Sequence, residues 1–479
     1  MRPLTSQRRS GAHRGDFFSR LGVYLRPLLS TIEDSSSIRL KLDDPETRRL
    51  AMPPKIWRAL IMPSDTEIGL ELRRSLAWLK EVDLYAASNS SAAHGSFVFA
   101  RHFCVPSVLE EGWLPVLQRV IDENQITHIF PAHDDVLLAL SENASSLRAK
   151  IVASPESTCK VARFKSATIH RLGNRLPTPR IYKTAPEVDH YPVFLKPDRG
   201  QGAQRAEIAI DRAELEMLLH RDPDRIIFEF LPGREFTVDC FSDRERGLLY
   251  ARGRERQRIR NGIAMRSAFA EDQRFQEYAA RINEELEFHG AWFFQLKEDA
   301  QGRLCLLEVA PRIGGTSCLS RVSGVNLPLL SLYENERIPV EIPQTKYRIE
   351  VDRALENRYR HDVLYRTVYV DLDDTLVVRG QVNPDLVRLL YQELNRGKTL
   401  VLLTRHGGDV AEYLARFRLQ ALFDKICEVK TGEKKSQFIT DTSAILIDDS
   451  FSECTEVRDC IGIPVFMTSM IEGLFDERA

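Results

Sequence analysis

Short apolar segments alternate with helical segments in two parts of the chain, and this alternation constrains the fold more than any other feature. In the first part, residues 58–64, 82–88 and 126–132 have the pattern of buried strands, and a helix is expected over 70–79. In the second part, further strands are expected at residues 367–373, 399–404, 425–430, 444–450 and 463–468. Strands that alternate with helices predict doubly wound parallel sheets, so the fold class is α/β.

The 479 residues are enough for several domains. We expect a basic tail over 1–55, a doubly wound domain over 56–150, a region of hairpins and helices over 151–345, a charged linker over 346–365 and a Rossmann-like domain over 366–479. The first 30 residues contain six arginines and a single acid but no apolar segment. A poorly ordered or loosely docked tail is therefore expected in place of a secretory signal, and an organelle-targeting or membrane-surface helix is the less favoured alternative.

Composition excludes several classes of protein. The net charge of −2 argues against nucleic-acid binding by bulk electrostatics. No apolar run approaches the roughly 20 residues of a membrane-spanning helix, so no membrane span is expected. The eight cysteines form no Cys-x-x-Cys pair, which predicts neither a zinc cluster nor a disulfide framework. A cytoplasmic protein is the simplest interpretation, and a homo-oligomer is left open.

Acidic and basic residues at successive strand ends give the clearest chemical signal. Asp371 and Asp373 follow the strand 367–370, Thr404 ends the next strand, and the pair Asp448-Asp449 ends a later one. Lys434 and Lys435 lie between these strands. In α/β sheets function gathers at the carboxyl ends of strands. A carboxylate can attack phosphorus, a second can protonate the leaving oxygen, and carboxylates with lysine can hold Mg²⁺ and phosphate.

These motifs, in this order, resemble the haloacid-dehalogenase-like phosphatase family over residues 366–479. The resemblance implies a nucleophile at Asp371, a general acid/base at Asp373, phosphate-binding groups at Thr404 and Lys435 with Lys434 as the alternative, and a Mg²⁺ site at Asp371, Asp373, Asp448 and Asp449. The gaps between the motifs leave no room for the cap domain of many relatives, so a capless domain is expected. The competing explanation is that these residues only cap strand ends.

A second group of motifs lies in the middle of the chain. A strand ends at Lys196 and is followed by a loop with Gly200 and Gly202, which lets backbone N–H groups approach phosphates. Glu229 and Glu235 flank the Pro232-Gly233 turn, a spacing suited to clamping adenine and ribose. The segment 293–310 reads as a hairpin, on which Gln295 and Glu308 are expected to face each other.

Together these motifs resemble the ATP-grasp superfamily, and within it the carboxylate–amine ligases related to the large chain of carbamoyl-phosphate synthase, over residues 56–345. The resemblance implies a pre-ATP-grasp domain over 56–150, an α+β ATP-grasp domain over 151–345, and ATP and Mg²⁺ as cofactors. The implied ATP-binding residues are Lys165, Lys196, Gly200 to Gln204 as a lid, Glu229, Leu231 and Glu235. The implied metal ligands are Gln295 and Glu308, and Arg312 is implied to contact phosphate near the reacting carboxylate.

The chain departs from the family pattern at two positions. Phe164 stands where an Asp usually precedes the first lysine, and Ala310 stands where an Asn usually follows the metal-binding Glu. The Ala310 side chain cannot bind a metal, so a second Mg²⁺ would lack one ligand. Water or Gln295 can substitute, because Mg²⁺ readily keeps waters.

Three features near these motifs have competing interpretations. The segment 252–260 contains five arginines and one glutamate, and a solvated strand face is favoured over a carboxylate or phosphate clamp beside the ATP. Arg266 is a further candidate for such a clamp. His133 is interpreted as a structural residue at a strand end.

The leading hypothesis is a bifunctional enzyme that couples a small-molecule carboxylate to an amine through an acyl phosphate, forms ADP, and hydrolyses a phosphorylated metabolite with its last domain. The alternative is a phosphatase with a non-catalytic ATP-binding sensor, motivated by Ala310. A third hypothesis is an interaction protein in which both sites are inactive. The sequence does not identify the substrates.

Overall fold

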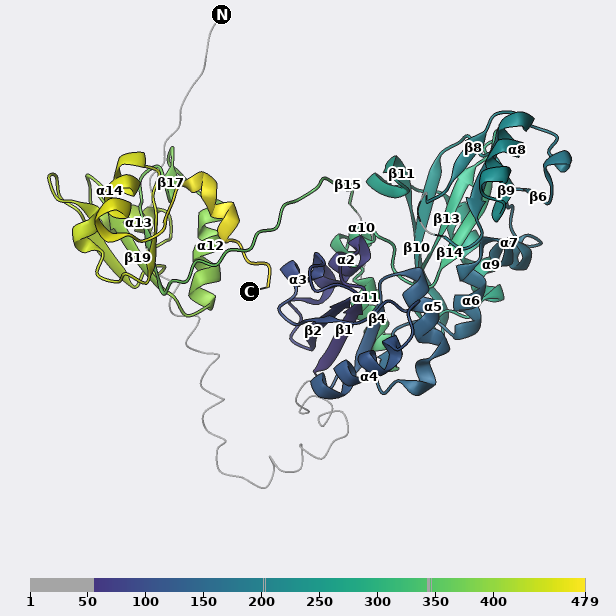
Figure 1. Cartoon of the computed structure of the whole chain (residues 1–479), viewed down its shortest axis with the longest axis horizontal. Coiled ribbons are helices and arrows are strands. Elements are labelled where there is room, and N and C mark those ends of the chain that lie inside the picture. The colour runs from purple at the N-terminus through teal and green to yellow at the C-terminus, as the bar shows by residue number, and fades with distance from the viewer. Residues whose placement is uncertain (1–55, 201, 203, 343–344, 346, 479) are drawn as a thin grey trace, which may run out of the picture. The chain divides into compact units, whose positions relative to one another are not determined.

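The structure is a computed structural model that describes residues 56–200, 202, 204–342, 345 and 347–478 (Figure 1). The predicted tail over 1–55 lies outside the described residues, as do Gln201 and Ala203 of the predicted lid. Among the described residues, no helix combines the length and apolar character that crossing a bilayer requires.

The first domain is a five-stranded parallel sheet in the order β3-β2-β1-β4-β5. Its strands are β1 (Trp57–Met62), β2 (Val82–Ser88), β3 (His102–Cys104), β4 (His128–Pro131) and β5 (Lys150–Ile151). Its helices are α2 (Glu67–Leu76), α3 (Gly95–Val98), α4 (Trp113–Asn124), α5 (Asp134–Glu142) and the 3₁₀ turn η1 (Ala144–Ser146). The three strands predicted here and the helix after β1 are confirmed.

Alternation along β1 explains why this sheet is covered on both faces. Ala59 and Ile61 pack in a core with residues of α2 and of α11 (Leu327–Asn335). Leu60 and Met62 point to the opposite face and pack with residues of α4. A strand that is apolar at successive positions is therefore buried on both faces, as expected for a parallel strand.

Two antiparallel sheets make up the middle of the chain. The smaller has the order β6-β9-β7-β8, formed by β6 (Ile181–Tyr182), β7 (Val193–Pro197), β8 (Glu207–Ala209) and β9 (Arg225–Glu229). The larger has the order β14-β13-β10-β11-β12-β15, formed by β10 (Glu235–Asp243), β11 (Gly247–Arg260), β12 (Ile263–Phe269), β13 (Gly290–Glu298), β14 (Leu304–Ala310) and β15 (Glu350–Asp352). The accompanying helices are α6 (Glu156–Arg163), α7 (Lys165–Leu172), η2 (Ala185–Glu187), α8 (Arg212–Arg221), α9 (Gln273–Glu285), α10 (Cys318–Val322) and α11.

Strand β15 differs from the predicted linker over 346–365. Its three residues pair antiparallel with β12, so the larger sheet extends past the predicted boundary at residue 345. Both outer residues of β15, Glu350 and Asp352, are exposed and form ion pairs with Arg266 and Arg258. A short, charged edge strand of this kind has no apolar alternation, which is why the sequence pattern did not reveal it.

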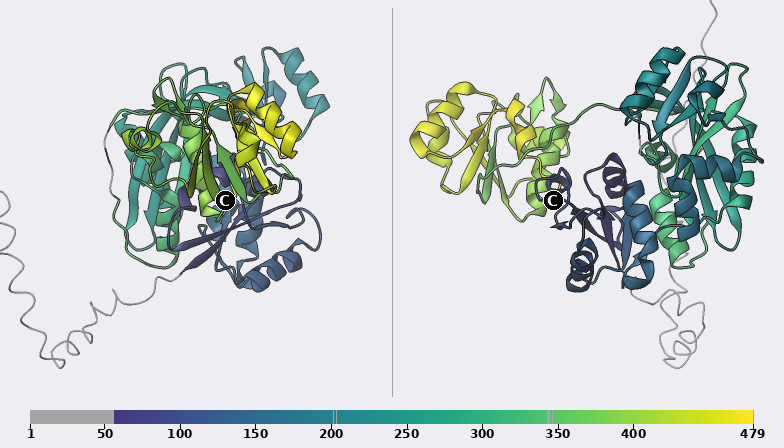
Figure 2. Two further views of the ribbon diagram at one scale, coloured as in Figure 1. Left: turned by 90° about the vertical axis from the view of Figure 1, so that its left-hand side faces the viewer. Right: turned by 45° about the vertical axis from the view of Figure 1, so that its right-hand side comes forward.

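The last domain is a second parallel sheet, in the order β20-β19-β16-β21-β22 (Figure 2, yellow-green to yellow). Its strands are β16 (Thr367–Val370), β17 (Val377–Val378), β18 (Gln381–Val382), β19 (Thr399–Thr404), β20 (Lys425–Glu428), β21 (Ala444–Ile447) and β22 (Val465–Phe466). Its helical segments are α12 (Pro384–Asn395), α13 (Val410–Arg416), η3 (Lys435–Phe438), α14 (Phe451–Ile461) and η4 (Thr468–Leu474). All five strands predicted here are confirmed, and only the small β17–β18 hairpin and α12 separate β16 from β19.

Candidate functional site

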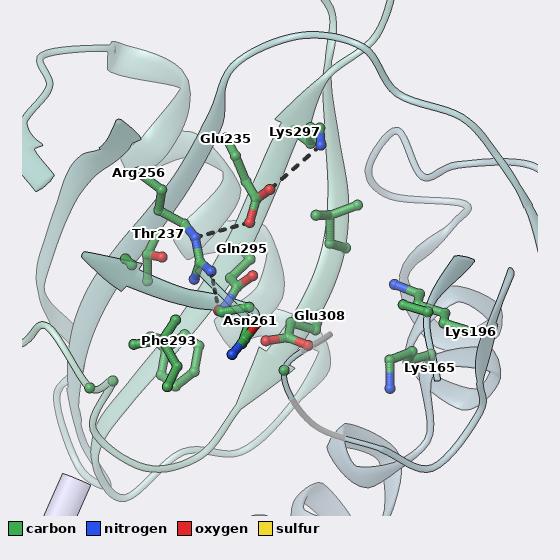
Figure 3. Close-up of a pocket in the computed structure, with 18 of the residues that line it drawn as sticks. Lys165, Lys196, Glu235, Thr237, Arg256, Asn261, Phe293, Gln295, Lys297 and Glu308 are labelled. Atoms are coloured by element: carbon green, nitrogen blue, oxygen red, sulfur yellow. Dashed lines mark hydrogen bonds and ion pairs between the residues drawn. The ribbon is translucent and has the colours of Figure 1, made fainter. Parts of the chain in front are cut away.

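A cleft of about 440 Å³ lies between the two antiparallel sheets of the middle region. Phe194, Lys196 and Phe228 line it from the smaller sheet, and Glu235, Gln295 and Glu308 are among the residues that line it from the larger sheet. Figure 3 shows Lys165 and Lys196 on one side of this cleft and the acidic and amide side chains on the other. The structure thus gathers residues that are far apart in the sequence.

Lys165 begins α7 and is buried against the loop that follows β7, which includes Asp198 and Gly200. Its Nζ donates to the carbonyl oxygens of Gly200, at 3.1 Å, and Asp198, at 3.3 Å. Phe164 provides no side-chain cap for α7, and Asp198 takes over this role. Its carboxylate accepts from the backbone N–H of Ser166, at 2.8 Å, and from the Ser166 hydroxyl, at 2.7 Å. The missing Asp is therefore replaced in space by an Asp from another loop.

Lys196 places a cation in the cleft with no carboxylate within 4.0 Å among the described residues. Its Nζ lies 4.7 Å from the centre of the Phe228 ring and 5.9 Å from that of Phe194. Burial lowers the pKa of Lys196 to about 8, while the charge of Glu308 acts in the opposite direction. Burial likewise lowers the pKa of Lys165. Two desolvated ammonium groups next to open space favour an anionic ligand.

The larger sheet supplies the acidic wall of the cleft. Gln295 on β13 and Glu308 on β14 are direct cross-strand partners, as the sequence predicted. Glu235 begins β10 and forms ion pairs with Arg256, at 3.0 Å, and Lys297, at 3.6 Å (Figure 3). Each oxygen of the carboxylate that was predicted to clamp ribose therefore already has a cationic neighbour.

The predicted hinge and lid residues also reach the cleft. Glu229 ends β9, and Leu231 follows in the connection to β10; both line the cleft. Gly202 lines it with a positive φ of 60°, a conformation that favours glycine. A Cβ on Gly202 would lie 3.3 Å from the carbonyl oxygen of Asn261, so this loop meets the tip of the β11–β12 hairpin. Gly200 accepts hydrogen bonds from Lys165 and, at 3.3 Å, from Arg163.

Arg312 lies at the cleft but is already paired. Its Nε and Nη2 donate to the two oxygens of Asp134, at 2.6 and 2.7 Å. Burial opposes ionisation of Asp134, but the Arg312 guanidinium holds the pKa of that carboxyl below its usual value. His133 caps α5 by accepting from the backbone N–H of Asp135, at 3.1 Å, which agrees with its interpretation as a structural residue.

The interpretation of 252–260 as a solvated strand face is wrong for its first half. Arg254 is 1% exposed, pairs with Asp239 and donates to Thr316 at 2.9 Å, and Arg256 turns toward Glu235. The register of β11 against β12 shifts between Arg256 and Arg258, and beyond this bulge the side chains of 257–260 are exposed. Beyond the bulge both faces of the strand are exposed, so one strand carries a buried and a solvated half. The further candidate Arg266 lies outside the cleft and pairs with Glu350.

Comparison with known proteins identifies this arrangement. A family described as "ATP-grasp in the biosynthetic pathway with Ter operon" matches residues 221–356. The biotin carboxylase domain of Hydrogenobacter thermophilus 2-oxoglutarate carboxylase, solved as a dimer with MgADP, ADP and bicarbonate, is 14% identical, with a TM-score of 0.51 over 60% of this chain and 71% of that chain. The central part of the chain has the ATP-grasp fold.

Further solved structures agree with the ATP-grasp fold. N5-carboxyaminoimidazole ribonucleotide synthetase in complex with ADP is 13% identical, with a TM-score of 0.52 over 72% of this chain and 86% of that chain. Biotin carboxylase from Campylobacter jejuni is 15% identical, with a TM-score of 0.50 over 60% and 72% of the two chains. A search of curated proteins gives no significant match.

Outside the ATP-grasp domain, a second cluster of charges lies at the strand ends of the last domain. Lys435 Nζ is 2.6 Å from Asp371 Oδ1 and 2.6 Å from Asp448 Oδ2. The three residues are nearly inaccessible, at 2%, 6% and 0% exposure respectively. Burial raises the pKa of Asp371 to about 6, although Lys435 acts against this shift. Lys434 is exposed, so the geometry selects Lys435 from the pair.

Three carboxylates of this cluster have the spacing of a cation site. Ligand atoms of Asp371, Asp448 and Asp449 all lie within 4.8 Å of one another. Asp449 Oδ1 accepts from the Thr375 hydroxyl at 3.0 Å, and Asp448 Oδ1 accepts from the Ser450 N–H at 2.9 Å, so both are oriented by neighbours. Carboxylate oxygens are the ligands that Mg²⁺ prefers, and within the described part of the chain no other group of three His, Cys, Asp or Glu residues has this geometry.

The side chain of Asp373 is not part of this set, although it was predicted as a metal ligand. Its carboxylate is paired with His406 Nδ1, at 2.8 and 3.1 Å, because His406 follows β19 and lies over the loop after β16. Thr404 is fully buried at the end of β19, and its Oγ1 accepts from the backbone N–H of His406 at 3.1 Å. His406 is thus a residue that the sequence analysis did not single out.

Several other cleft residues were also missed. They are Glu67, Asp134, Thr237, Asn261, Lys297 and Arg353. Arg254 and Arg256 also line the cleft, and a clamp beside the ATP was the less favoured interpretation of their segment, 252–260. Glu67 lies in the first domain, and Arg353 lies beyond the predicted end of the ATP-grasp domain. No local pattern therefore connected either residue to the cleft.

Proposed function

We propose that the chain is a bifunctional enzyme: an ATP-dependent, ADP-forming carboxylate–amine ligase joined to a Mg²⁺-dependent phosphatase. The observation that carries the ligase is the placement of Lys165 and Lys196 across a cleft from Gln295 and Glu308 in an ATP-grasp domain. The MgADP and ADP bound in two proteins of similar structure support ATP and Mg²⁺ as the cofactors.

In the ligase site the protein positions phosphates and neutralises their charge. Glu229, Leu231 and Glu235 would hold the nucleoside, and Lys165, Lys196 and the backbone around Gly202 would contact its phosphates. Gln295 and Glu308 would hold Mg²⁺, which neutralises the charge of the β- and γ-phosphates. A substrate carboxylate oxygen attacks the γ-phosphorus, the bond to the β-phosphate oxygen breaks, and ADP leaves. An amine then attacks the acyl carbon and displaces phosphate.

In the phosphatase site the structure supports a nucleophile at Asp371. Asp371 Oδ would attack the phosphorus of a phosphate ester while the ester oxygen leaves, which creates an aspartyl phosphate. Asp373 would donate a proton to the leaving oxygen and later take one from the water that hydrolyses the intermediate. Thr404 and Lys435 would contact the transferring group, and Asp371, Asp448 and Asp449 would hold Mg²⁺, a role that the 4.8 Å spacing of their ligand atoms supports.

The ligase is tested by ADP release from ATP and Mg²⁺ in the presence of pooled carboxylic acids and amines. We expect release that depends on both added pools and that is lost in Lys196→Ala. The same variant should keep its phosphatase activity, because Lys196 belongs to a different domain. ATP that fails to bind to the wild-type protein, measured by calorimetry, would overturn the ligase.

The phosphatase is tested separately with p-nitrophenyl phosphate. We expect Mg²⁺-dependent hydrolysis in the wild-type protein and none in Asp371→Asn, with ATP binding unchanged. Trapping of a covalent phosphate by acid quench should likewise require Asp371. Hydrolysis that survives Asp371→Asn in a purified, folded protein would contradict the assignment.

One observation favours a second candidate, a phosphatase with a nucleotide-sensing domain. Ala310 is the cross-strand partner of Phe293, which lines the cleft, and its side chain offers no ligand atom two positions after Glu308. If this loss prevents turnover, ATP binds and no ADP forms with any pair of substrates. In that case Ala310→Asn should restore Mg²⁺-dependent ADP formation, whereas a catalytic wild-type domain already shows it.

A further inference from the structure

The end of the cleft around Gly314 and Gly315 contains several charged side chains, and most are already neutralised. Arg312 is held by Asp134 and Arg254 by Asp239, and Arg256 is held by Glu235 at 3.0 Å. A buried arginine that has a carboxylate partner has little capacity left for a ligand, because its charge is compensated within the protein.

Arg353 is the exception among the described arginines that line the cleft. It follows β15, and its backbone N–H donates to the carbonyl of Met265 at 2.8 Å, which fixes the start of its side chain. No carboxylate among the described residues lies within 4.0 Å of its guanidinium, which is half-buried. Burial lowers the pKa of Arg353, and the groups that face it are Cys318, Glu67, Glu71 and Arg254. A guanidinium group stays charged in proteins. Arg353 is therefore a partly desolvated cation that no neighbouring carboxylate among the described residues pairs with.

Glu67 is the matching uncompensated anion. It begins α2 in the first domain, lines the same cleft, and has no ion-pair partner within 4.0 Å among the described residues. Its nearest acidic neighbour on the same helix, Glu71, is by contrast fully engaged by Arg321. Glu67 is also accessible from the cleft, so a ligand can reach it.

Gly315 shows that the two uncompensated charges meet at one place. A Cβ on this glycine would lie 2.9 Å from Cγ and 3.5 Å from Oε1 of Glu67, and 3.7 Å from Nη1 of Arg353. The two side chains therefore border the same short piece of backbone, yet they do not pair with each other. The absence of a side chain at Gly315 keeps the space between them open.

We propose that Glu67 and Arg353 form a subsite for an α-amino acid, in which Arg353 binds the carboxylate and Glu67 binds the ammonium group. A zwitterion satisfies both charges at once, whereas a simple amine leaves Arg353 unpaired and a dicarboxylate faces Glu67 with a like charge. This inference deepens the proposed ligase and rests on it, because it names the class of substrate that would lie next to the ATP.

The test is calorimetric binding of individual L- and D-α-amino acids to the full chain saturated with MgADP. Binding needs no second substrate and no turnover. Each amino acid that binds is compared with the acid that lacks its amino group and the amine that lacks its carboxyl group. We expect at least one amino acid to bind at least about tenfold more tightly than both of these analogues, because each analogue lacks one charge-assisted contact.

Two variants and one control separate this subsite from a general loss of structure. Arg353→Gln should weaken the binding of the amino acid at least about tenfold. Glu67→Gln should remove the preference for the amino acid over its deaminated analogue. MgADP affinity should stay unchanged in both. Arg258→Gln, an exposed arginine that pairs with Asp352, should behave as wild type.

The outcomes distinguish the inference from the function on which it rests. MgADP binding without any amino acid binding, or amino acid binding that neither variant alters, would overturn the subsite and leave the ligase standing. A wild-type chain that does not bind MgADP would overturn the ligase and the subsite together.

Discussion

His406 Nδ1 lies 2.8 Å from Oδ2 of Asp373 in the last domain, beside the site that we propose to be a phosphatase site. The imidazole ring is also packed against Tyr413, with ring centres 4.3 Å apart, so the pair is held in one geometry. His406 therefore orients the residue to which we assign proton transfer, and it does so from the loop that follows Thr404 at the end of β19. It is a positioning residue and does not itself contact the reacting atoms.

We predict that His406→Ala lowers kcat for alkyl phosphates by between about 10- and 100-fold, as loss of an orienting partner commonly does. The loss on p-nitrophenyl phosphate should be much smaller, because its leaving group needs little protonation. His406→Asn, which keeps an N–H near the position of Nδ1, should recover part of the activity. Equal losses on both substrates would show a structural role only.

The charge of Lys435 compensates two buried carboxylates. Although burial by itself lowers the pKa of Lys435, Asp371 and Asp448 raise it above its usual value. Replacing Lys435 with Met leaves these carboxylates unpaired, which typically costs about 3–5 kcal/mol of the free energy of unfolding. Thermal unfolding should show a large loss without Mg²⁺ and a substantial recovery with Mg²⁺. The exposed neighbour Lys434→Met is the matched control and should change little.

Binding of Mg²⁺ at Asp371, Asp448 and Asp449 should release protons near pH 6. Burial raises the pKa of Asp371 to about 6 and also raises that of Asp448. The metal requires the ionised form, so its affinity should rise with pH up to about 6 and level off above it. Without metal, the free energy of unfolding should instead fall as pH rises. A carboxyl whose pKa is raised in the folded state stabilises the protein at low pH, and this contribution is lost as pH rises from 3.8 through about 6. Calorimetry of Mg²⁺ binding in buffers with different ionisation enthalpies measures the proton release, which should be absent at pH 8.

The buried charge of Lys196 should destabilise the folded protein when no nucleotide is bound. Its pKa is lowered from 10.5 to about 8, so the unfolded state binds its proton more tightly and stability rises with pH between these values. Lys196→Met should therefore increase the free energy of unfolding at pH 7, by roughly 3 kcal/mol at 1.36 kcal/mol per pKa unit. The same variant should lose the stabilisation that MgATP gives the wild-type protein. Denaturant unfolding with and without MgATP measures both effects, and a less stable nucleotide-free variant would contradict them.

The two halves of β11 predict losses of stability of very different size for two arginines on one strand. Arg254→Ala leaves the buried carboxylate of Asp239 unpaired and should cost about 3–5 kcal/mol of unfolding free energy. Arg258→Ala removes an exposed pair with Asp352 and should cost no more than about 1 kcal/mol. Urea unfolding of both variants measures this difference. Similar losses in both would mean that the bulge does not separate a buried from a solvated half.

Local pattern predicted the elements that are rich in apolar residues and the motifs at their ends. The strands β1, β16 and β21 follow from continuous apolar runs, and the facing of Gln295 and Glu308 follows from the hairpin between them. The same reasoning missed β15, which is short and charged, and assigned all of 252–260 to solvent because a bulge cannot be read from composition. The side chain of Asp373 was assigned to the metal set, whereas His406 holds it apart.

The sequence alone determined that two parallel sheets and an intervening region of hairpins and helices would form, because the period of apolar residues and the position of glycine and proline act over a few residues. It also determined which strand ends carry lysine and carboxylate. Only the tertiary structure decided which charges are neutralised: Arg312, Arg254 and Lys435 have carboxylate partners, while Lys196, Arg353 and Glu67 have no ion-pair partner within 4.0 Å in the part of the chain that the structure describes. The physical reason is that ion pairing depends on a few ångströms between residues tens or hundreds of positions apart, and no local pattern encodes that distance.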